Sequence, residues 1–241
     1  MVRLLLVLPV IQALTVIDLP GDWSQILRHK YTPKEEMDLP ELSVCMRFYP
    51  HKVAGGNVGW QDVLASIMMG RTTSNADQYI HVGFFEKEDG RKDPSGRPWG
   101  RIGTNFKGAK FFTGGDVERV PLRWYNLCVT FSFEEGKGTF FQYYLNGELN
   151  FEERSERIGD SVWVPGTNLS IGYREFQFTG VPFQGMVTDV QLFSKFLSFE
   201  EATGYTSCKN SIKGDLADWN MADWERSLNG VPGKNNEYEI D

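Results

Sequence analysis

The chain has 241 residues, of which 41% are hydrophobic and 14% aromatic. This apolar content is enough to fill a core, so a disordered acidic chain is excluded as the class of protein. The formal net charge is −7, and no run of five or six like charges occurs. We therefore expect no nucleic-acid partner and no binding to an anionic membrane surface.

The N-terminus predicts a segment that is removed from the mature protein. A short positive start precedes the apolar run LLLVLPVIQALTV, which extends from Leu4 to Val16. A run of this length is typical of a signal peptide and is too short to cross a bilayer. We therefore assign residues 1–16 to a signal peptide and predict a secreted, extracellular protein with no membrane span. A buried N-terminal strand is the alternative interpretation.

Short apolar stretches separated by turn residues recur along the chain and predict strands. The clearest is the segment 42–49, in which apolar and polar side chains alternate. Residues 140–151 predict a hairpin, because Asn146-Gly147 tolerates positive φ at both positions of a type I′ turn. Further strands are expected at 78–86, 124–131, 168–173 and 185–193, and residues 87–100 predict an exposed loop.

One short helix is predicted near 198–205. Ser198 precedes Glu201 by three positions, which is the spacing of a capping box at a helix N-terminus. The composition changes after Cys208, so residues 209–241 are expected to form a C-terminal tail or linker. Trp219 and Trp224 in this tail favour a segment pinned onto its own domain. An aromatic binding surface is the alternative.

Two of the three cysteines occupy matching positions in predicted strands. Cys45 lies on the polar face of the segment 42–49, and Cys128 lies on the polar face of the segment 124–131. If the two strands are neighbours, both thiols project from one face at a separation that a disulfide accepts. A secretory route oxidises thiols, so we prefer a disulfide to two buried free cysteines. Cys208 is the odd cysteine: it is free, or it pairs with a partner chain or with a missing part of this one.

The ordered motifs resemble a known family. VCMRF and WYNLCVTF are followed by YLNG, LSIGY and then FQGMVTDVQLFSKFLSFEE, and this series resembles the pentraxin domain from Leu39 to Cys208. The resemblance implies an all-β fold, a two-sheet antiparallel jelly-roll sandwich of the concanavalin A or laminin-G-like type, within a domain at 17–208. It also implies that Cys45 and Cys128 occupy the disulfide positions of the family.

The resemblance further implies a calcium-dependent ligand site. The matching positions offer Asn75 and Asp77 before one strand, and Glu175 and Gln177 after the LSIG strand. Oxygen ligands of this kind suit calcium. However, the second group is interrupted by a cation, Arg174, and by a phenyl ring, Phe176. We therefore expect this chain to share the fold of the family more closely than its calcium site. The favoured interpretation is that these four residues are ordinary surface residues, and one weak calcium site is the alternative.

Signals of catalysis are missing from the sequence. The three histidines form no metal-ligand spacing, and no strand carries the alternating carboxylates that some glucanases of this fold use as acid and nucleophile. We therefore predict a protein that is not an enzyme. Asn168-Leu169-Ser170 is an N-glycosylation sequon, which predicts a glycoprotein.

These observations favour a secreted, non-catalytic recognition module that binds a glycan or another extracellular ligand. Weak dependence on calcium is the alternative to binding without a metal. The alternative is a structural module that mediates protein–protein contacts within a larger extracellular or receptor protein. Many pentraxins form rings, so a homo-oligomer is one of the expected partners, although subunit contacts leave no short motif that would decide it.

Overall fold

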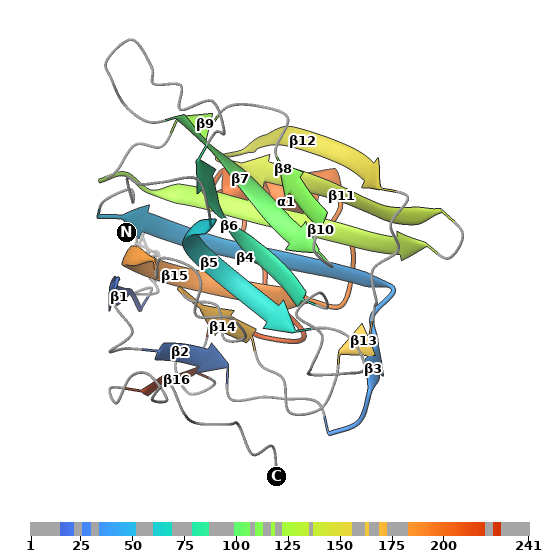
Figure 1. The fold of residues 1–241 in the computed structure, drawn as a ribbon, viewed down its shortest axis with the longest axis horizontal. Coiled ribbons are helices and arrows are strands. Elements are labelled where there is room, and N and C mark those ends of the chain that lie inside the picture. Colours follow the sequence, from blue (N-terminus) through green and yellow to red (C-terminus); the bar gives the residue numbers. More distant parts are fainter. Residues whose placement is uncertain are drawn as a thin grey trace, which may run out of the picture.

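The described part of the chain folds as two large antiparallel sheets, a small two-stranded sheet and one helix. The computed structural model describes residues 15–21, 26–29, 34–51, 60–68, 79–86, 99–106, 109–112, 117–118, 122–134, 137–155, 162–163, 169–172, 183–219 and 224–227. Figure 1 shows the two sheets stacked face to face, with the helix behind the six-stranded sheet. The predicted two-sheet sandwich is therefore confirmed.

The first sheet has six strands in the order β1-β15-β4-β10-β11-β12. Its three longest strands come from distant parts of the chain and lie side by side at its centre. The bounds are β1 (Ile17–Pro20), β15 (Gln184–Phe193), β4 (Glu41–Pro50), β10 (Tyr125–Glu134), β11 (Gly138–Leu145) and β12 (Glu148–Ser155).

The second sheet has eight strands, in the order β16-β2-β14-β5-β6-β7-β8 with β9 paired to β7. Consecutive strands such as β4 and β5 belong to different sheets, so the chain repeatedly crosses between the two layers. A separate two-stranded sheet pairs β13 with β3. The bounds are β16 (Trp224–Ser227), β2 (Ile26–His29), β14 (Leu169–Ile171), β5 (Trp60–Met68), β6 (Tyr79–Glu86), β7 (Trp99–Phe106), β8 (Ala109–Phe112), β9 (Val117–Glu118), β3 (Met37–Asp38) and β13 (Val162–Trp163).

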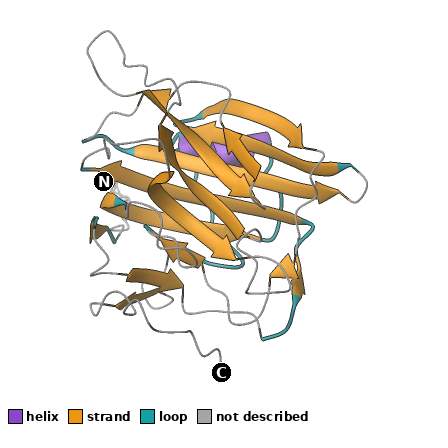
Figure 2. Ribbon diagram, viewed as in Figure 1, coloured by secondary structure: helices purple, strands orange, loops and turns teal. Residues whose placement is uncertain are grey.

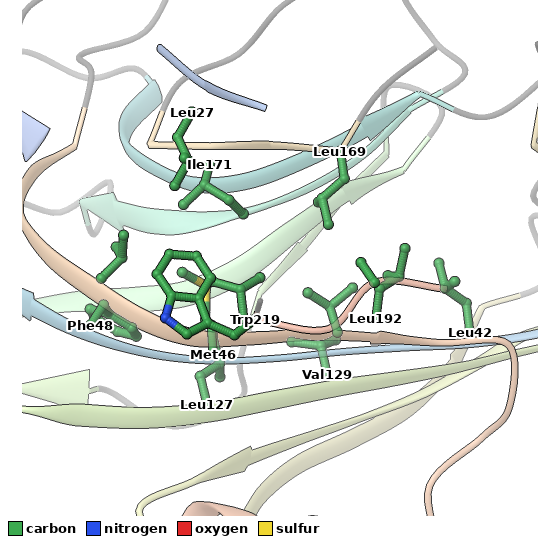
Figure 3. Packing of buried hydrophobic residues seen from close by; sticks show 14 of the residues in the cluster. Leu27, Leu42, Met46, Phe48, Leu127, Val129, Leu169, Ile171, Leu192 and Trp219 are labelled. Atoms are coloured by element: carbon green, nitrogen blue, oxygen red, sulfur yellow. The ribbon is translucent and has the colours of Figure 1, made fainter. Parts of the chain in front are cut away.

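The hydrophobic core lies between the two sheets. The inward faces of β4 and β10 supply alternate apolar side chains, as their sequence patterns predict, and these are at most 2% exposed. Leu27, Leu169 and Ile171 reach them from the opposite sheet, as Figure 3 shows. Complete burial of a side chain of this size stabilises the fold by about 1.5–3 kcal/mol. The inward residues of β4 and β10 are Val44, Met46, Phe48, Leu127, Val129 and Phe131.

The other face of the six-stranded sheet, which we call the outer face, carries the disulfide. Cys45 and Cys128 stand directly opposite each other in the β4–β10 register, with their Cα atoms 4.1 Å apart, and they are bonded. Both are fully buried in a second apolar cluster that includes Leu197, Ala202 and Tyr205. The predicted disulfide is confirmed, because the pairing brings the polar faces of both strands to the same side.

The helix α1 (Phe199–Thr206) covers part of the outer face and packs against β10, β11 and β12. Figure 2 shows this helix on the far side of the strands. The backbone N–H of Glu201 donates to the Ser198 hydroxyl, and the backbone N–H of Ser198 donates to the Glu201 carboxylate. The predicted capping box is therefore confirmed. The Lys195 ammonium also donates to Glu201, at 2.5 Å.

The predicted hairpin is also confirmed. Asn146 and Gly147 have φ angles of 51° and 94°, so both turn positions are left-handed, as the Asn-Gly pair allows. Leu145 and Glu148 pair on either side of the turn. The turn also contacts the neighbouring strand, because the Asn146 side chain accepts a hydrogen bond from the backbone N–H of Asn126 at 2.9 Å.

Two predictions fall largely outside the described residues. Of the predicted signal peptide, only residues 15–16 are described, and both are exposed. Of the predicted loop at 87–100, only Trp99 and Gly100 are described. Both belong to β7, so the loop prediction is wrong at those two positions. No helix in the described part of the chain is long and apolar enough to cross a membrane.

Removing the disulfide is expected to destabilise the protein strongly. Cys45 and Cys128 are separated by 83 positions. Closing a loop of that length stabilises the folded state by about 4 kcal/mol in the chain-entropy model. We expect the double variant Cys45→Ala/Cys128→Ala to lose about 2–5 kcal/mol in denaturant unfolding. Cys208→Ala is the matched control, because this thiol is exposed and unbonded. Equal stability of the double variant and the control would contradict the prediction.

The capping carboxylate is expected to contribute stability that depends on pH. The hydrogen bond from Lys195, and then that from the Ser198 backbone, lowers the pKa of Glu201 below its ordinary value of 4.5. A lowered pKa in the folded state gives stability that is present above pH 4.5 and is lost as the pH falls. Glu201→Gln should therefore unfold more easily than the natural chain near neutral pH. The difference, about 0.5 kcal/mol at this exposed site, should shrink in acid. A difference that stays constant with pH in urea titrations would contradict this.

Candidate functional site

The predicted calcium ligands lie outside the described residues. Asn75 and Asp77 fall between β5 and β6, and Glu175 and Gln177 follow β14. The strands beside them are adjacent in the eight-stranded sheet, since β14 pairs with β5 and β5 pairs with β6. In the described ranges alone, no group of three His, Cys, Asp or Glu side chains is arranged to hold a metal ion. The calcium site therefore remains a prediction.

The predicted glycosylation site lies at the edge of what is described. Asn168 itself is outside the described residues, whereas Leu169 and Ser170 of the sequon lie in β14 and are buried. Ser170 pairs with Arg28 of β2 on one side and with Ser66 of β5 on the other. Modification of Asn168 stays a prediction.

The two tail tryptophans are part of the core. Trp219 is 9% exposed and Trp224 is 3% exposed, with their ring centroids 5.3 Å apart. The indole N–H of Trp219 donates to the carbonyl of Thr15 at 2.6 Å, and that of Trp224 donates to the carbonyl of Asp218 at 3.1 Å. The prediction that they pin the C-terminal segment is confirmed, and the alternative of an aromatic binding surface at these residues is wrong.

Buried charges lie where the C-terminal segment meets the outer face. The Arg47 guanidinium on β4 lies 2.9 Å from the Asp189 carboxylate on β15, and their side chains are 15% and 7% exposed. The guanidinium carbon also lies 4.9 Å from the centroid of the Tyr205 ring on α1. The Tyr205 hydroxyl donates to the backbone carbonyl of Asp189 at 2.5 Å. Two strands and the helix are therefore joined through one ion pair.

A bulge in β15 brings Asp189 to this side of the sheet. The β15–β4 register shifts between Thr188 and Gln191, and Asp189 has a left-handed φ of 51°. An extra residue at a bulge re-aims a side chain. The Gln191 amide then donates to both Asp189 and Asp218, at 3.0 Å in each case. The amide oxygen of Gln191 accepts from the backbone N–H of Gly214 at 2.7 Å, which fixes the C-terminal segment to β15.

The electrostatics hold Tyr205 and Arg47 of this cluster in their protonated forms. Burial, followed by the charge of Asp189, raises the pKa of Tyr205 well above its ordinary value, so the phenol keeps its proton. Burial acts to lower the pKa of Arg47, but Tyr205, Asp189 and Cys208 outweigh it and raise that pKa. Neither group exchanges a proton near neutral pH. Sequence reasoning missed this cluster, although an Asp inside the apolar GMVTDVQLF stretch was a signal for it.

Cys208 lies beside this cluster and is exposed. The Arg47 guanidinium donates to its sulfur at 3.0 Å, and the residue has a φ of 60° just after the helix. Within the described residues it has no disulfide partner. Pairing of Cys208 with a partner chain or with a further part of this one stays a prediction.

Breaking the buried ion pair is expected to cost more than breaking an exposed one. Arg47→Ala leaves the Asp189 carboxylate buried without its cation, which should lower the free energy of unfolding by about 3 kcal/mol. Arg154→Ala is the matched control. Arg154 lies 3.1 Å from Glu134, with both side chains at least one-third exposed, so its loss should cost less than about 1 kcal/mol. Equal losses for the two variants in urea unfolding would show that Asp189 is not effectively desolvated.

Solved structures with similar folds were found over most of the chain. A crystal structure of a native heptameric SAP-like pentraxin from Limulus polyphemus is 19% identical, has a TM-score of 0.64, and matches over 90% of this chain and 93% of its own. Domain 4 of AbnA, an extracellular arabinanase from Geobacillus stearothermophilus solved with arabinotriose, is 12% identical with a TM-score of 0.50, covering 78% of this chain and 75% of that domain.

An intramolecular trans-sialidase from leech is 14% identical with a TM-score of 0.50, covering 81% of this chain and 27% of its own. At these identities the likeness shows a shared fold. No curated protein that was compared with the chain matches it. A family model described as the concanavalin A-like lectin/glucanases superfamily matches residues 29–203, well over half of the sequence. The chain therefore belongs to the concanavalin A-like lectin/glucanase superfamily.

Proposed function

We propose that this protein is a secreted, non-catalytic recognition module that binds a glycan or another extracellular ligand. The observation that carries the proposal is the match of residues 29–203 to the concanavalin A-like superfamily. Further support comes from the similar structures, one of which is a pentraxin and another a domain solved with arabinotriose. The buried disulfide supports secretion, because such bonds form and persist in oxidising compartments.

The proposed ligand site lies on the eight-stranded sheet and uses calcium. Asn75 and Asp77 would supply oxygen ligands from the β5–β6 connection, and Glu175 and Gln177 would supply them from the segment after β14. Carboxylate and amide oxygens fit a hard divalent cation. The cation of Arg174 within the second group opposes calcium, so a weak site is proposed. When bound, calcium would present open coordination positions to oxygen atoms of the ligand.

The state of the described acidic residues supports a non-catalytic role. Asp189 is occupied by Arg47 and Gln191 in a buried position, out of reach of a substrate. The acidic run that begins at Glu152 lies on β12, the edge strand of the six-stranded sheet. Glu152 there accepts a hydrogen bond from Gln142 at 2.8 Å. Hydrolysis of a glycosidic bond requires two carboxyl groups that flank the scissile bond, and Asp189 and Glu152 are both held by hydrogen bonds from other side chains.

One observation favours the alternative, a structural module of a larger extracellular protein. The thiol of Cys208 is exposed and unbonded, and in an oxidising compartment such a thiol joins a second chain. Electrophoresis without reducing agent distinguishes the two functions. A covalent dimer that binds no glycan would favour the structural module over the recognition module.

Calcium is expected to stabilise the protein against heat. A ligand that binds only the folded state adds RT ln(1 + [L]/Kd) to the free energy of unfolding. We expect the melting temperature to rise in about 5 mM calcium relative to excess chelator, a concentration that saturates a weak sensor-type or extracellular site. Asp77→Ala should abolish the rise. Glu153→Ala, which removes an exposed carboxylate from the edge strand β12, should retain it.

The same variants test ligand recognition. An oligosaccharide array probed in calcium should report binding by the natural chain and by Glu153→Ala, and weaker binding by Asp77→Ala. Absence of both the thermal shift and array binding would overturn the proposed function. A thermal shift without array binding would support the calcium site but not glycan binding, and the search for a ligand would turn to proteins.

A further inference from the structure

A second candidate surface lies on the outer face of the six-stranded sheet. The helix α1 packs over β10, β11 and β12. The end of β4 and the start of β10 form another part of this face. Tyr49 follows the core residue Phe48 on β4, and Trp124 precedes the core residue Tyr125 on β10. Because side chains alternate along a strand, Tyr49 and Trp124 both point to the outer face.

Four side chains define this region, which we call the outer aromatic surface: Tyr49, His51, Leu122 and Trp124. Trp124 is 40% exposed and Leu122 is 63% exposed, and both large apolar side chains lie in the segment that enters β10. The ring centroids of Tyr49 and Trp124 are 5.5 Å apart with the planes tilted by 53°. His51 meets Tyr49 edge-on at 6.1 Å. The tilt leaves Trp124 40% exposed, so part of its ring is open to a ligand.

The surface stands on a rigid support. Beneath it, the rings of Phe48 and Tyr125 stack at 5.2 Å with an interplanar angle of 10°. Leu122 has a left-handed φ of 61°, a conformation that costs a non-glycine residue about 1 kcal/mol. Its backbone N–H donates to the carbonyl of Pro50 at 2.8 Å, which ties the entry of β10 to the end of β4. A surface held in this way loses little entropy when a ligand binds.

Polar groups border the aromatic rings. The Nδ1 atom of His51 lies 3.7 Å from a carboxylate oxygen of Asp18 on β1, and their side chains are 33% and 65% exposed. An imidazole both donates and accepts hydrogen bonds, and an exposed carboxylate accepts several. The surface therefore combines flat apolar faces with hydrogen-bonding groups at its border. A sugar ring has the matching chemistry, with an apolar C–H face and a rim of hydroxyl groups.

We propose that the outer aromatic surface is a second glycan site that works without calcium. One pyranose unit stacks its C–H face on the exposed ring of Trp124 with its edge against Tyr49, and its hydroxyl groups hydrogen-bond to His51 and Asp18. The class of ligand rests on the proposed function, but the position does not, because this site lies on the opposite sheet from the proposed calcium site.

The size of the surface favours a sugar over a second copy of the chain. A stable protein interface buries about 800 Å² on each partner and involves about 20–30 residues a side. Among the described residues, the outer aromatic surface and its polar border comprise five side chains, which is the scale of a small-ligand contact. A sugar unit is therefore the occupant to which the proposal commits.

The test is an oligosaccharide array probed in excess chelator, so that the proposed calcium site is silent. We expect the natural chain to bind, and Trp124→Ala to bind at least about tenfold more weakly, because loss of an aromatic contact of this kind corresponds to about 1.4 kcal/mol. Trp124→Phe should recover part of the binding. Phe199→Ala is the matched control, since Phe199 is 55% exposed on the outer face but lies on α1. It should bind as the natural chain does.

The outcomes separate the two sites. Binding in chelator that survives Asp77→Ala and falls in Trp124→Ala supports the second site. Binding that requires calcium, falls in Asp77→Ala and survives Trp124→Ala overturns the second site and retains the proposed function. Absence of any binding overturns both. Three further results would each overturn the second site. The first is an equal loss of binding in Phe199→Ala. The second is that Trp124→Ala is unfolded at the assay temperature while Tyr49→Phe and Trp124→Phe bind normally, and the third is that Trp124→Ala dissociates a dimer in sedimentation.

Discussion

The pairing of β4 with β10 is the interaction on which the rest of the structure depends. Eight consecutive residue pairs set its register, and Cys45 opposite Cys128 makes one of those pairs covalent. A slip by one residue would turn every inward side chain of one strand to the outer face. The disulfide excludes that slip. The same pairing therefore places the core on one side of the sheet and the helix, the buried ion pair and the outer aromatic surface on the other.

Features with local causes could be predicted from the sequence. Alternation of apolar and polar residues around Cys45 and Cys128 predicted which side chains of the two strands face the core and which face outward. Asn146-Gly147 predicted the hairpin, and the spacing of Ser198 and Glu201 predicted the start of the helix. Each depends on neighbours within a few residues. Very short strands such as β3, β9 and β13 could not be predicted, because two residues carry no periodicity and their pairing is decided by distant partners.

The candidate sites were less accessible to sequence reasoning, for physical reasons. Asp189 looked like one polar residue in an apolar strand, and only the bulge and the approach of Arg47 turn it into an ion pair. Tyr49 and Trp124 lie far apart in sequence and meet through strand pairing alone. Conversely, motif resemblance suggested the calcium residues near Asp77 without any local signal that fixes their geometry.

The link between Cys45 and Cys128 also has a topological consequence. The chain between these residues, which contains β5, β6, β7 and β8, is a closed covalent loop with both ends held at the centre of the six-stranded sheet. A protease that cuts once anywhere within this loop leaves the two fragments attached to each other. A chain nicked in this way keeps its mass until it is reduced, and its two pieces stay registered along the same pair of strands.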